Sequence, residues 1–310
     1  MLWWFPQCHY SHDYLASLVL MMLTSILIAQ TNAAYHILRV RSYMMILMWQ
    51  FVATMTTTMH PLVAEGSREV PMLTAFCLAM AYLLLFRTYQ TTNPVADGFH
   101  IFFMLGVGTL FMPSFGLLVP LFLWHWAVFM RCLSLRTFFA ALIGFILPFW
   151  GWVSWLLWRE NLTPLSDWWQ ACTNIGPTNY IEAVKGWGAS EYTLAAPFLV
   201  LVALTLWTTG YYLLNSNDDK IRVRMTMYTY IAQSWGIILL AFVTLNPISF
   251  TPLLLLSLCP YAAHYFTLRT TTISLVVFIC FVVAFVIIFV NTIFDLTYIL
   301  NYFTNFNLRF

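Results

Sequence analysis

Uncharged apolar blocks alternate with polar connections along the whole of this chain. At about 1.5 Å per helical residue, blocks of this length match a hydrocarbon layer about 30 Å thick. Backbone polar groups inside such a layer must be satisfied within the segment itself, so each block is expected to form a helix. The ten blocks are 15–29, 44–59, 71–86, 100–111, 115–129, 138–158, 194–214, 228–245, 253–266 and 272–290. The pattern predicts an all-α, multi-pass membrane helix bundle.

Basic residues gather in every second connection between these blocks. Nine of the thirteen lie there, namely Arg39, Arg41, Arg87, Arg131, Arg136, Lys220, Arg222, Arg224 and Arg269. The other four, Arg68, Arg159, Lys185 and Arg309, are spread over the remaining connections and the C-terminal tail. Because Lys and Arg favour the cytoplasmic side of a membrane, this asymmetry predicts ten transmembrane helices with both the N-terminus and the C-terminus extracytoplasmic.

The block at 100–111 is short for a membrane span, and Met112-Pro113-Ser114 separates it from the block at 115–129. If the two blocks formed one kinked helix, every later connection would change sides and the basic cluster at 220–224 would lie outside. The charge pattern therefore favours a tight hairpin over residues 100–129. Its first arm is either a short span or a re-entrant element, which is tolerated where other helices bury its backbone.

Composition favours one integral membrane domain over residues 1–310. Only 8% of the residues are charged, whereas a soluble domain has about 25%. No basic run follows the pattern of a nucleic-acid-binding surface, so no nucleic acid partner is expected. The six cysteines form neither a CxxC pair nor a metal-binding spacing, and no metal or cofactor is predicted.

The connection at 159–193 is the longest polar stretch, and it falls on the predicted extracytoplasmic side. It mixes Leu165, Trp168, Trp169, Ile181 and Trp187 with polar residues. Such a mixture predicts a helix that lies in the membrane interface. It either anchors the chain there, covers an entry for lipid, or docks a partner.

Small residues in an otherwise bulky sequence mark positions of close helix approach. Gly106, Gly108 and Gly144 are the local exceptions among large apolar side chains. Glycine allows two helix backbones to approach closely, so we expect helix–helix contacts at these positions.

Six short elements occur in a fixed order within residues 39–150. They are R-S-Y, H-P, R-x-Y-Q, G-x-x-x-L-F-x-P, R-x-x-S-x-R and A-L-x-G-x-x-x-P. This ordered set resembles a Bacteroidota family of polytopic membrane proteins that has no established activity. The resemblance implies a bacterial cytoplasmic (inner) membrane location and membrane lipids as partners, and it implies no particular reaction.

The segment 106–150 is also similar, mainly in its apolar pattern, to a helical pair of membrane glycosyltransferases that use polyprenyl-phosphate sugars. Those enzymes place an acidic general base in an early extracytoplasmic loop, and the resemblance implies this role for Glu65 or Glu69. The acidic pair that usually follows the first span is absent here, and Asp13 is the nearest substitute.

His60, Glu65, Arg68 and Glu69 form the densest ionisable set on the predicted outer side. A carboxylate in this set suits a general base, His60 is a further catalytic candidate, and an arginine suits a phosphate. The alternative is a solvated turn between two helices, for which Pro61 is an ordinary residue.

Three arginines are candidates for binding lipid phosphate at the cytoplasmic leaflet. Arg131 and Arg136 flank a short step between two long apolar blocks, and Arg87 lies one connection away. A guanidinium fork matches phosphate oxygens, and each contact with an anionic surface contributes about 1 kcal/mol. The alternative is that these residues only orient the spans.

His125 and His264 are the two histidines inside apolar blocks. Intramembrane ionisable residues are candidates for function, although a neutral imidazole can also be satisfied by a backbone or hydroxyl partner. No Asp, Glu, Lys or Arg falls within a block core, which argues against an ion- or proton-coupled carrier.

Three functions remain open from the sequence. The first is envelope biogenesis, with binding or processing of a polyprenyl-linked or other lipid substrate. The second is a non-catalytic membrane subunit that stabilises or positions a partner membrane protein, and the third is a lipid or solute carrier. An outward polar cavity that reaches Glu65 or Glu69 favours the first, and a filled bundle with an exposed groove favours the second.

Overall fold

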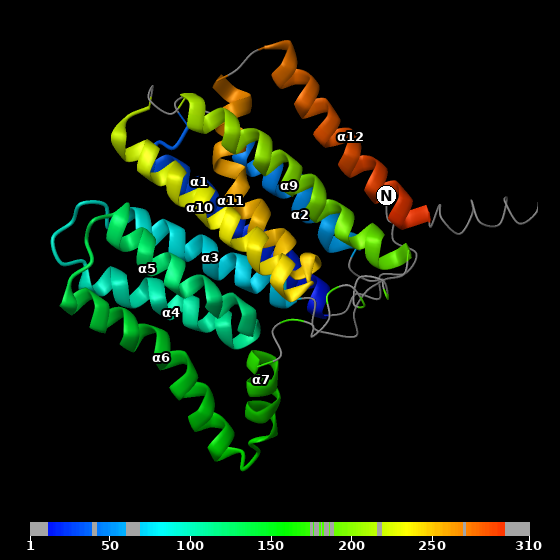
Figure 1. Cartoon of the computed structure of the whole chain (residues 1–310). Coiled ribbons are helices and arrows are strands. Elements are labelled where there is room, and N and C mark those ends of the chain that lie inside the picture. Colours follow the sequence, from blue (N-terminus) through cyan, green and yellow to red (C-terminus); the bar gives the residue numbers. More distant parts are fainter. Residues whose placement is uncertain are drawn as a thin grey trace, which may run out of the picture.

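The computed structural model describes residues 12–38, 42–59, 69–173, 176, 180, 182, 186, 189–215, 219–268 and 271–294. Within these ranges the chain is helical apart from short connections (Figure 1). The helices are α1 (His12–Tyr35), α2 (Met44–Met59), α3 (Glu69–Arg87), α4 (Val95–Phe111), η2 (Pro113–Leu118), α5 (Val119–Val128), α6 (Leu135–Trp158), α7 (Thr163–Thr173), α9 (Ala189–Asn215), α10 (Ile221–Thr244), α11 (Pro247–Leu268) and α12 (Thr272–Phe294). The all-α prediction is confirmed for this part of the chain.

Helix α11 forms the centre of the bundle. Every residue from Phe250 to Tyr265 is buried, because α2, α3, α9, α10 and α12 pack around it. Its polar side chains find partners inside the bundle: the Ser257 hydroxyl is hydrogen-bonded to the Tyr82 hydroxyl of α3 at 2.8 Å. The core is therefore filled with side chains around α11.

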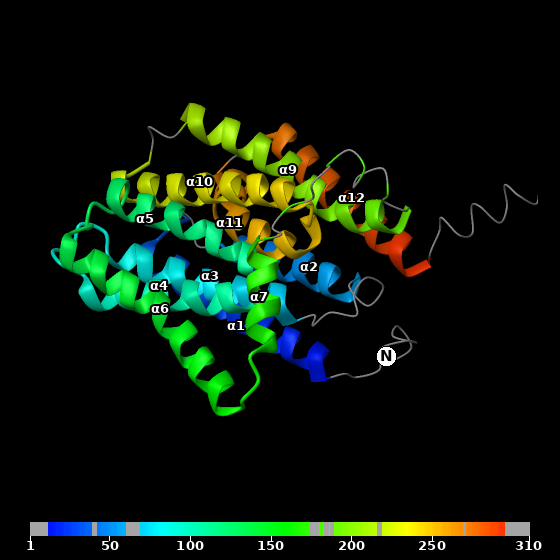
Figure 2. The same ribbon diagram turned by 60° about the horizontal axis from the view of Figure 1, so that its bottom comes forward.

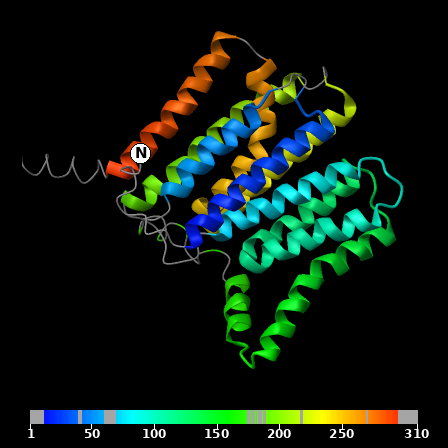
Figure 3. The same ribbon diagram turned by 180° about the vertical axis from the view of Figure 1, so that it is seen from behind.

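Helices α6 and α12 lie at opposite edges of the bundle (Figures 2 and 3). Only 17% of the most apolar stretch of each is buried inside the protein. Trp150 and Trp158 of α6 and Ile273 and Ile287 of α12 are all more than 60% exposed. Water does not tolerate such long apolar faces, whereas lipid does.

Residues 95–128 form a tight hairpin. Gly98 of α4 lies against Trp126 of α5, and Gly108 lies against Phe115 of η2, so the two arms run antiparallel. The kinked-helix alternative is therefore excluded. The first arm begins at Val95, five residues before the predicted block, because Pro94 provides the helix N-cap and Gly98 and Ile101 are buried in the first two turns.

Helices α4 and α6 approach closely at the predicted glycines. A Cβ atom at Gly106 would lie 2.5 Å from the backbone oxygen of Phe145, and a Cβ at Gly144 would collide with the backbone oxygen of Phe99. The structure thus confirms close packing at these positions, since no side chain fits there.

The connections that carry most of the basic residues lie at one end of the bundle. The Gln90 amide donates to the Met130 carbonyl at 3.1 Å, which joins the α3–α4 and α5–α6 connections. The Arg222 guanidinium lies 5.3 Å from the ring of Tyr35 and 5.8 Å from that of Tyr89. The α1, α3–α4 and α10 ends are thereby joined as well. Arg39, Arg41 and Arg269 lie outside the described residues.

Five described helices are long and apolar enough to cross a membrane. The segments concerned are Leu15–Tyr35, Leu135–Trp158, Ala195–Asn215, Ile221–Thr244 and Thr272–Asn291. Shorter apolar helices supply Met44–Thr56, Pro71–Arg87, Val95–Phe111 and Pro113–Val128. The connection at 159–193 contains α7, and none of the side chains of α7 is buried. That this helix lies in the membrane interface stays a prediction.

Candidate functional site

The structure describes no side chain of the predicted catalytic residues. His60 and Glu65 lie outside the described residues. Glu69 is the first residue of α3, and its side chain is not described. Their proposed roles stay predictions.

Arg131 and Arg136 lie in and just after the α5–α6 connection, and both are exposed. Neither has a hydrogen bond or ion pair with another described residue. Ser134 caps the N-terminus of α6 by accepting the Thr137 amide, so Arg136 lies in the first helical turn. A helix N-terminus favours an anion and disfavours a cation. An anion held between the two arginines would therefore stabilise both the N-terminus of α6 and the two guanidinium groups.

Arg87 differs from these two arginines, because it already has a partner. Its guanidinium forms an ion pair with Asp97 of α4, while 59% of the side chain stays exposed. A phosphate at this position would compete with the Asp97 carboxylate. Among the three predicted phosphate ligands, Arg131 and Arg136 are therefore the more available.

Cys132 lies between these arginines and is buried. Its thiol donates to the Thr88 hydroxyl at 3.4 Å, and the same hydroxyl accepts the Trp126 indole N–H at 3.1 Å. Burial raises the pKa of the Cys132 thiol, so the group stays protonated. This network fixes the α5–α6 connection against α3 and positions the exposed arginines.

His264 lies near the end of α11, and the structure brings it to an acidic residue. Its Nε2 atom is 3.5 Å from Oδ2 of Asp219, and both side chains are almost fully buried. The Tyr212 hydroxyl of α9 donates to the same carboxylate oxygen at 3.1 Å. The cluster joins α9, the start of α10 and α11 at the basic end of the bundle, where it stabilises the helix ends. This position differs from the midplane sites of many secondary transporters.

His125 of α5 is fully buried among aromatic rings. The ring centroids of Phe122, Trp124 and Phe129 lie 5.4 to 6.1 Å from that of His125. Neither ring nitrogen has a hydrogen-bond partner among the described residues. The two buried histidines thus have contrasting environments.

A shallow apolar groove, which we call the α10 groove, follows the outer face of α10. Its volume is about 720 Å³. Ala232 and Gly236 are among the α10 residues that line it, and the Leu121 side chain of α5 lies against Gly236. The lining residues are Leu121, Tyr180, Ala232, Trp235, Gly236, Ile238, Leu239, Phe242 and Val243.

Tyr180 closes one end of the α10 groove. Its hydroxyl donates to the Val243 carbonyl at 2.9 Å, although Tyr180 belongs to the long connection between α7 and α9. At the other end, the ring of Tyr228 lies 6.3 Å from that of Phe129, two residues before Arg131. Neither of these two rings lines the groove, which runs along α10 from Ala232, one helical turn after Tyr228, to Val243.

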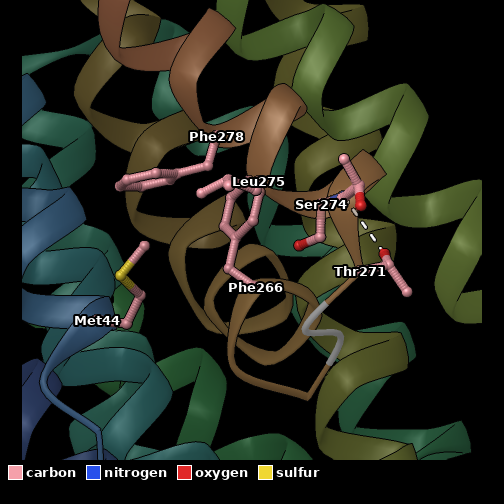
Figure 4. Close-up of a pocket in the computed structure, with 7 residues that line it drawn as sticks. Met44, Phe266, Thr271, Ser274, Leu275 and Phe278 are labelled. Carbon is pink, nitrogen blue, oxygen red and sulfur yellow. Dashed lines mark hydrogen bonds between the residues drawn. The ribbon is translucent and has the colours of Figure 1, made fainter.

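A second hollow lies at the start of α12 (Figure 4). It has a volume of about 450 Å³ and is lined by Met44, Phe266, Thr271, Thr272, Ser274, Leu275 and Phe278. The Thr271 hydroxyl accepts the Ser274 amide at 3.4 Å, which is an N-cap contact. The residues that line this hollow carry hydroxyl groups and no charge, so it offers less to an anionic ligand than Arg131 and Arg136 do.

Comparisons with models of known protein families, with curated proteins and with solved structures give no match to this chain.

Sequence reasoning missed Asp219 and the α10 groove. Asp219 lies in a connection, and nothing in its sequence context indicates that it folds over the helix ends to meet His264. The groove has a sequence signal in Ala232 and Gly236, which are small residues four apart on an otherwise bulky helix. That spacing usually indicates a close helix contact, and here Leu121 of α5 does lie against Gly236, while both small residues also line the groove.

Proposed function

We propose that this protein is a multi-pass membrane protein that binds a lipid with a phosphate headgroup. The α10 groove holds the apolar chain, and Arg131 and Arg136 hold the phosphate. The observation that carries the proposal is an open apolar groove of about 720 Å³ on a helix bundle whose Arg131 and Arg136 are exposed and have no ion pair with another described residue. Groove residues 232–243 extend for about 17 Å along α10, a length that suits a lipid chain.

The proposed membrane arrangement has ten spans, formed by α1, α2, α3, α4, η2 with α5, α6, α9, α10, α11 and α12. Each corresponds to one apolar block, and α11, with 22 residues, is about 33 Å long. The basic end of the bundle faces the cytoplasm and both termini lie outside, which suits the bacterial inner membrane.

This orientation is tested by labelling single cysteines in a cysteine-free variant of the chain. Gln170→Cys in α7 and Lys220→Cys before α10 both place a cysteine at an exposed position. An impermeant maleimide added to intact cells is expected to label the first and spare the second. Equal labelling of both, or the reverse, contradicts the orientation.

Lipid binding is tested by filling the groove. Ala232→Leu enlarges a side chain that lines it, and a photoreactive phospholipid should then crosslink several-fold less to the purified full-length protein. Ala203→Leu is the matched control, because Ala203 lines a separate apolar groove of about 310 Å³ between α9 and α12. Equal crosslinking of wild type and both variants would overturn the proposal.

A separate variant tests whether the two arginines bind the phosphate headgroup. Arg131→Gln with Arg136→Gln removes both charges and keeps hydrogen-bonding side chains. We expect this variant to lose its preference for anionic over zwitterionic lipid in native mass spectrometry. An unchanged preference means that the two arginines act only as orientation signals.

A second candidate function is that of a non-catalytic subunit that positions a partner membrane protein. The filled core around α11 favours binding over processing of a substrate. The far half of α6 extends beyond the bundle (Figure 1) and exposes Trp150, Trp155 and Trp158. Replacing these three tryptophans by leucine preserves an apolar surface. If a partner docks there, the variant should lose a complex that wild type retains in a mild detergent.

A further inference from the structure

The hollow at the start of α12, which we call the α12 hollow, contains a buried hydroxyl group without a partner. Ser274 lines this hollow, and its exposed fraction is 3%. Its amide donates to the Thr271 hydroxyl at 3.4 Å, whereas its own hydroxyl forms no hydrogen bond with another described residue. Most buried polar side chains in proteins have a partner, so this exception calls for an explanation such as a bound molecule.

Two helices begin at the α12 hollow. Met44 is the first residue of α2, Thr272 is the first residue of α12, and both line the hollow. A hydroxyl group caps each helix start, since Ser42 accepts the Met44 amide at 3.1 Å and Thr271 accepts the amide of Ser274. The first amide groups of a helix have no partner within the helix, and they give its N-terminus a partial positive charge. Two such ends favour an electron-rich group in the hollow, and its lining residues include no carboxylate.

The α12 hollow lies at the edge of the bundle, where α12 exposes large apolar side chains. Leu275 lines the hollow and is 59% exposed, and its neighbour Ile273 is 61% exposed. Phe266 of α11 and Phe278 of α12 also line the hollow, so an apolar wall continues beside the hydroxyl groups (Figure 4). In the proposed membrane arrangement this surface faces lipid. A molecule that reaches Ser274 from this side therefore carries a hydrocarbon chain.

The lining residues of the α12 hollow carry no charge, and this selects the headgroup of the ligand. A phosphate group stays ionised at neutral pH, and burying it without a cation is unfavourable. A carboxyl group can bind in either protonation state, because the Ser274 hydroxyl donates to a carboxylate oxygen or accepts from a carboxyl O–H. Partial burial raises the pKa of such an acid toward neutrality, while the two helix N-termini stabilise its ionised form. The hollow therefore suits a carboxyl group better than a phosphate.

We infer that the α12 hollow binds the carboxyl group of a long-chain fatty acid, with the Ser274 hydroxyl as its hydrogen-bond partner. Phe278 is one helical turn from Ser274 on the same face of α12, so the chain continues along apolar side chains away from the helix start. The inference rests on the proposed membrane arrangement. It does not depend on phosphate binding by Arg131 and Arg136, because the α10 groove and the α12 hollow have no lining residue in common.

The test measures crosslinking of a photoreactive fatty acid, with a diazirine in its chain, to the purified full-length protein. Oleic acid is expected to compete more strongly than methyl oleate, which has no ionisable carboxyl group, and more strongly than phosphatidylglycerol. Ser274→Ala removes the hydroxyl and should weaken binding by a factor on the order of five, as the loss of one hydrogen bond allows. Ser274→Thr keeps a hydroxyl at the same position and should retain binding.

A second variant fills the α12 hollow without changing Ser274. Leu275→Trp enlarges an exposed side chain that lines the hollow and should reduce crosslinking several-fold. Val276→Trp is the matched control, because Val276 is also exposed and lines the separate groove between α9 and α12. Equal crosslinking of wild type, Ser274→Ala and Leu275→Trp overturns the inference, and so does an equal loss in the two tryptophan variants.

The competitors separate a fatty-acid site from the alternatives. Equal competition by methyl oleate and oleic acid overturns the inference, because the carboxyl group then contributes nothing. Stronger competition by phosphatidylglycerol than by oleic acid also overturns it and makes the α12 hollow a phospholipid site. These results do not depend on Ala232→Leu, which tests the proposed function at the α10 groove, so either idea can fail without the other.

Discussion

Helices α11 and α12 are consecutive, contain 22 and 23 residues, and carry no Asp, Glu, Lys or Arg. The more polar of the two, α11, is buried on all sides. Helix α12 consists almost entirely of large apolar residues, and its most apolar stretch is only 17% buried. In a water-soluble protein, the more apolar of two such helices would be the buried one. The comparison teaches that apolar composition in this chain reports contact with lipid, and that burial inside the protein depends on packing and polar pairing.

The largest expected effect comes from removing a core side chain from α11. Leu254 is 0% exposed, so Leu254→Ala should lower the free energy of unfolding by about 2–5 kcal/mol. Ile279→Ala on α12 is the matched control, since its side chain is 50% exposed and should cost about 0.5 kcal/mol. Denaturant titration of the protein in detergent gives both values. Similar losses for the two variants would contradict the contrast between the helices.

The same contrast exists within α6 and can be tested with two glycines. Gly144 faces the backbone of α4, whereas no atom lies within 4 Å of a Cβ at Gly151. Gly144→Ala should destabilise the protein by about 1–3 kcal/mol, because backbone cannot yield as a side chain can. Gly151→Ala should be neutral or stabilise by up to about 1 kcal/mol through helix propensity. Thermal unfolding of the two variants, measured side by side, tests this prediction. Equal shifts in their melting temperatures would falsify it.

A smaller effect is expected from the polar group that α11 has and α12 lacks. His264→Leu removes a partner of the buried Asp219 carboxylate, which should cost about 1–3 kcal/mol. The double variant with Asp219→Asn removes the charge as well and should recover part of the loss. If the double variant is as unstable as the sum of the two single variants, the groups do not interact.

The smallest effect is a difference in labelling rate between two cysteines, and it does not depend on a change in stability. Cys259 of α11 is buried and Cys280 of α12 is exposed. Both lie in apolar surroundings, so the difference between them is access. In detergent, a membrane-permeant maleimide is expected to label Cys280 first, and peptide mass spectrometry locates the adduct. Faster labelling of Cys259 would show that α11 is not enclosed.

The apolar pattern predicted where the helices of the bundle lie, although not all of their ends. The block at 44–59 coincides with α2, because a run of apolar residues between polar connections has only one way to satisfy its backbone in a membrane. Gly106 and Gly144 also marked positions of close helix approach, which in the structure are contacts between α4 and α6. The start of α4 at Val95 was missed because Asp97 and His100 are polar, although Gly98 between them is buried.

The candidate site was harder to predict, because it depends on contacts between distant segments. Arg131 and Arg136 were found from their charge and position. Asp219 and Tyr212 meet His264 only through tertiary packing, which local sequence does not encode. The α10 groove is lined by residues of α5, α10 and the connection between α7 and α9, and the sequence of α10 alone does not encode how side chains of the other two segments lie beside it.

The enclosure of α11 has a consequence for how the chain enters the membrane. A helix with two internal prolines and polar residues such as Ser257 and His264 is a weak signal for insertion into lipid by itself. Helix α12, which follows within a few residues, is a strong one. We expect α11 to leave the translocon together with α12 and to be released into a cradle already formed by α2, α3, α9 and α10. Truncation before α12 should therefore leave α11 outside the membrane during synthesis, where quality-control proteases act on it.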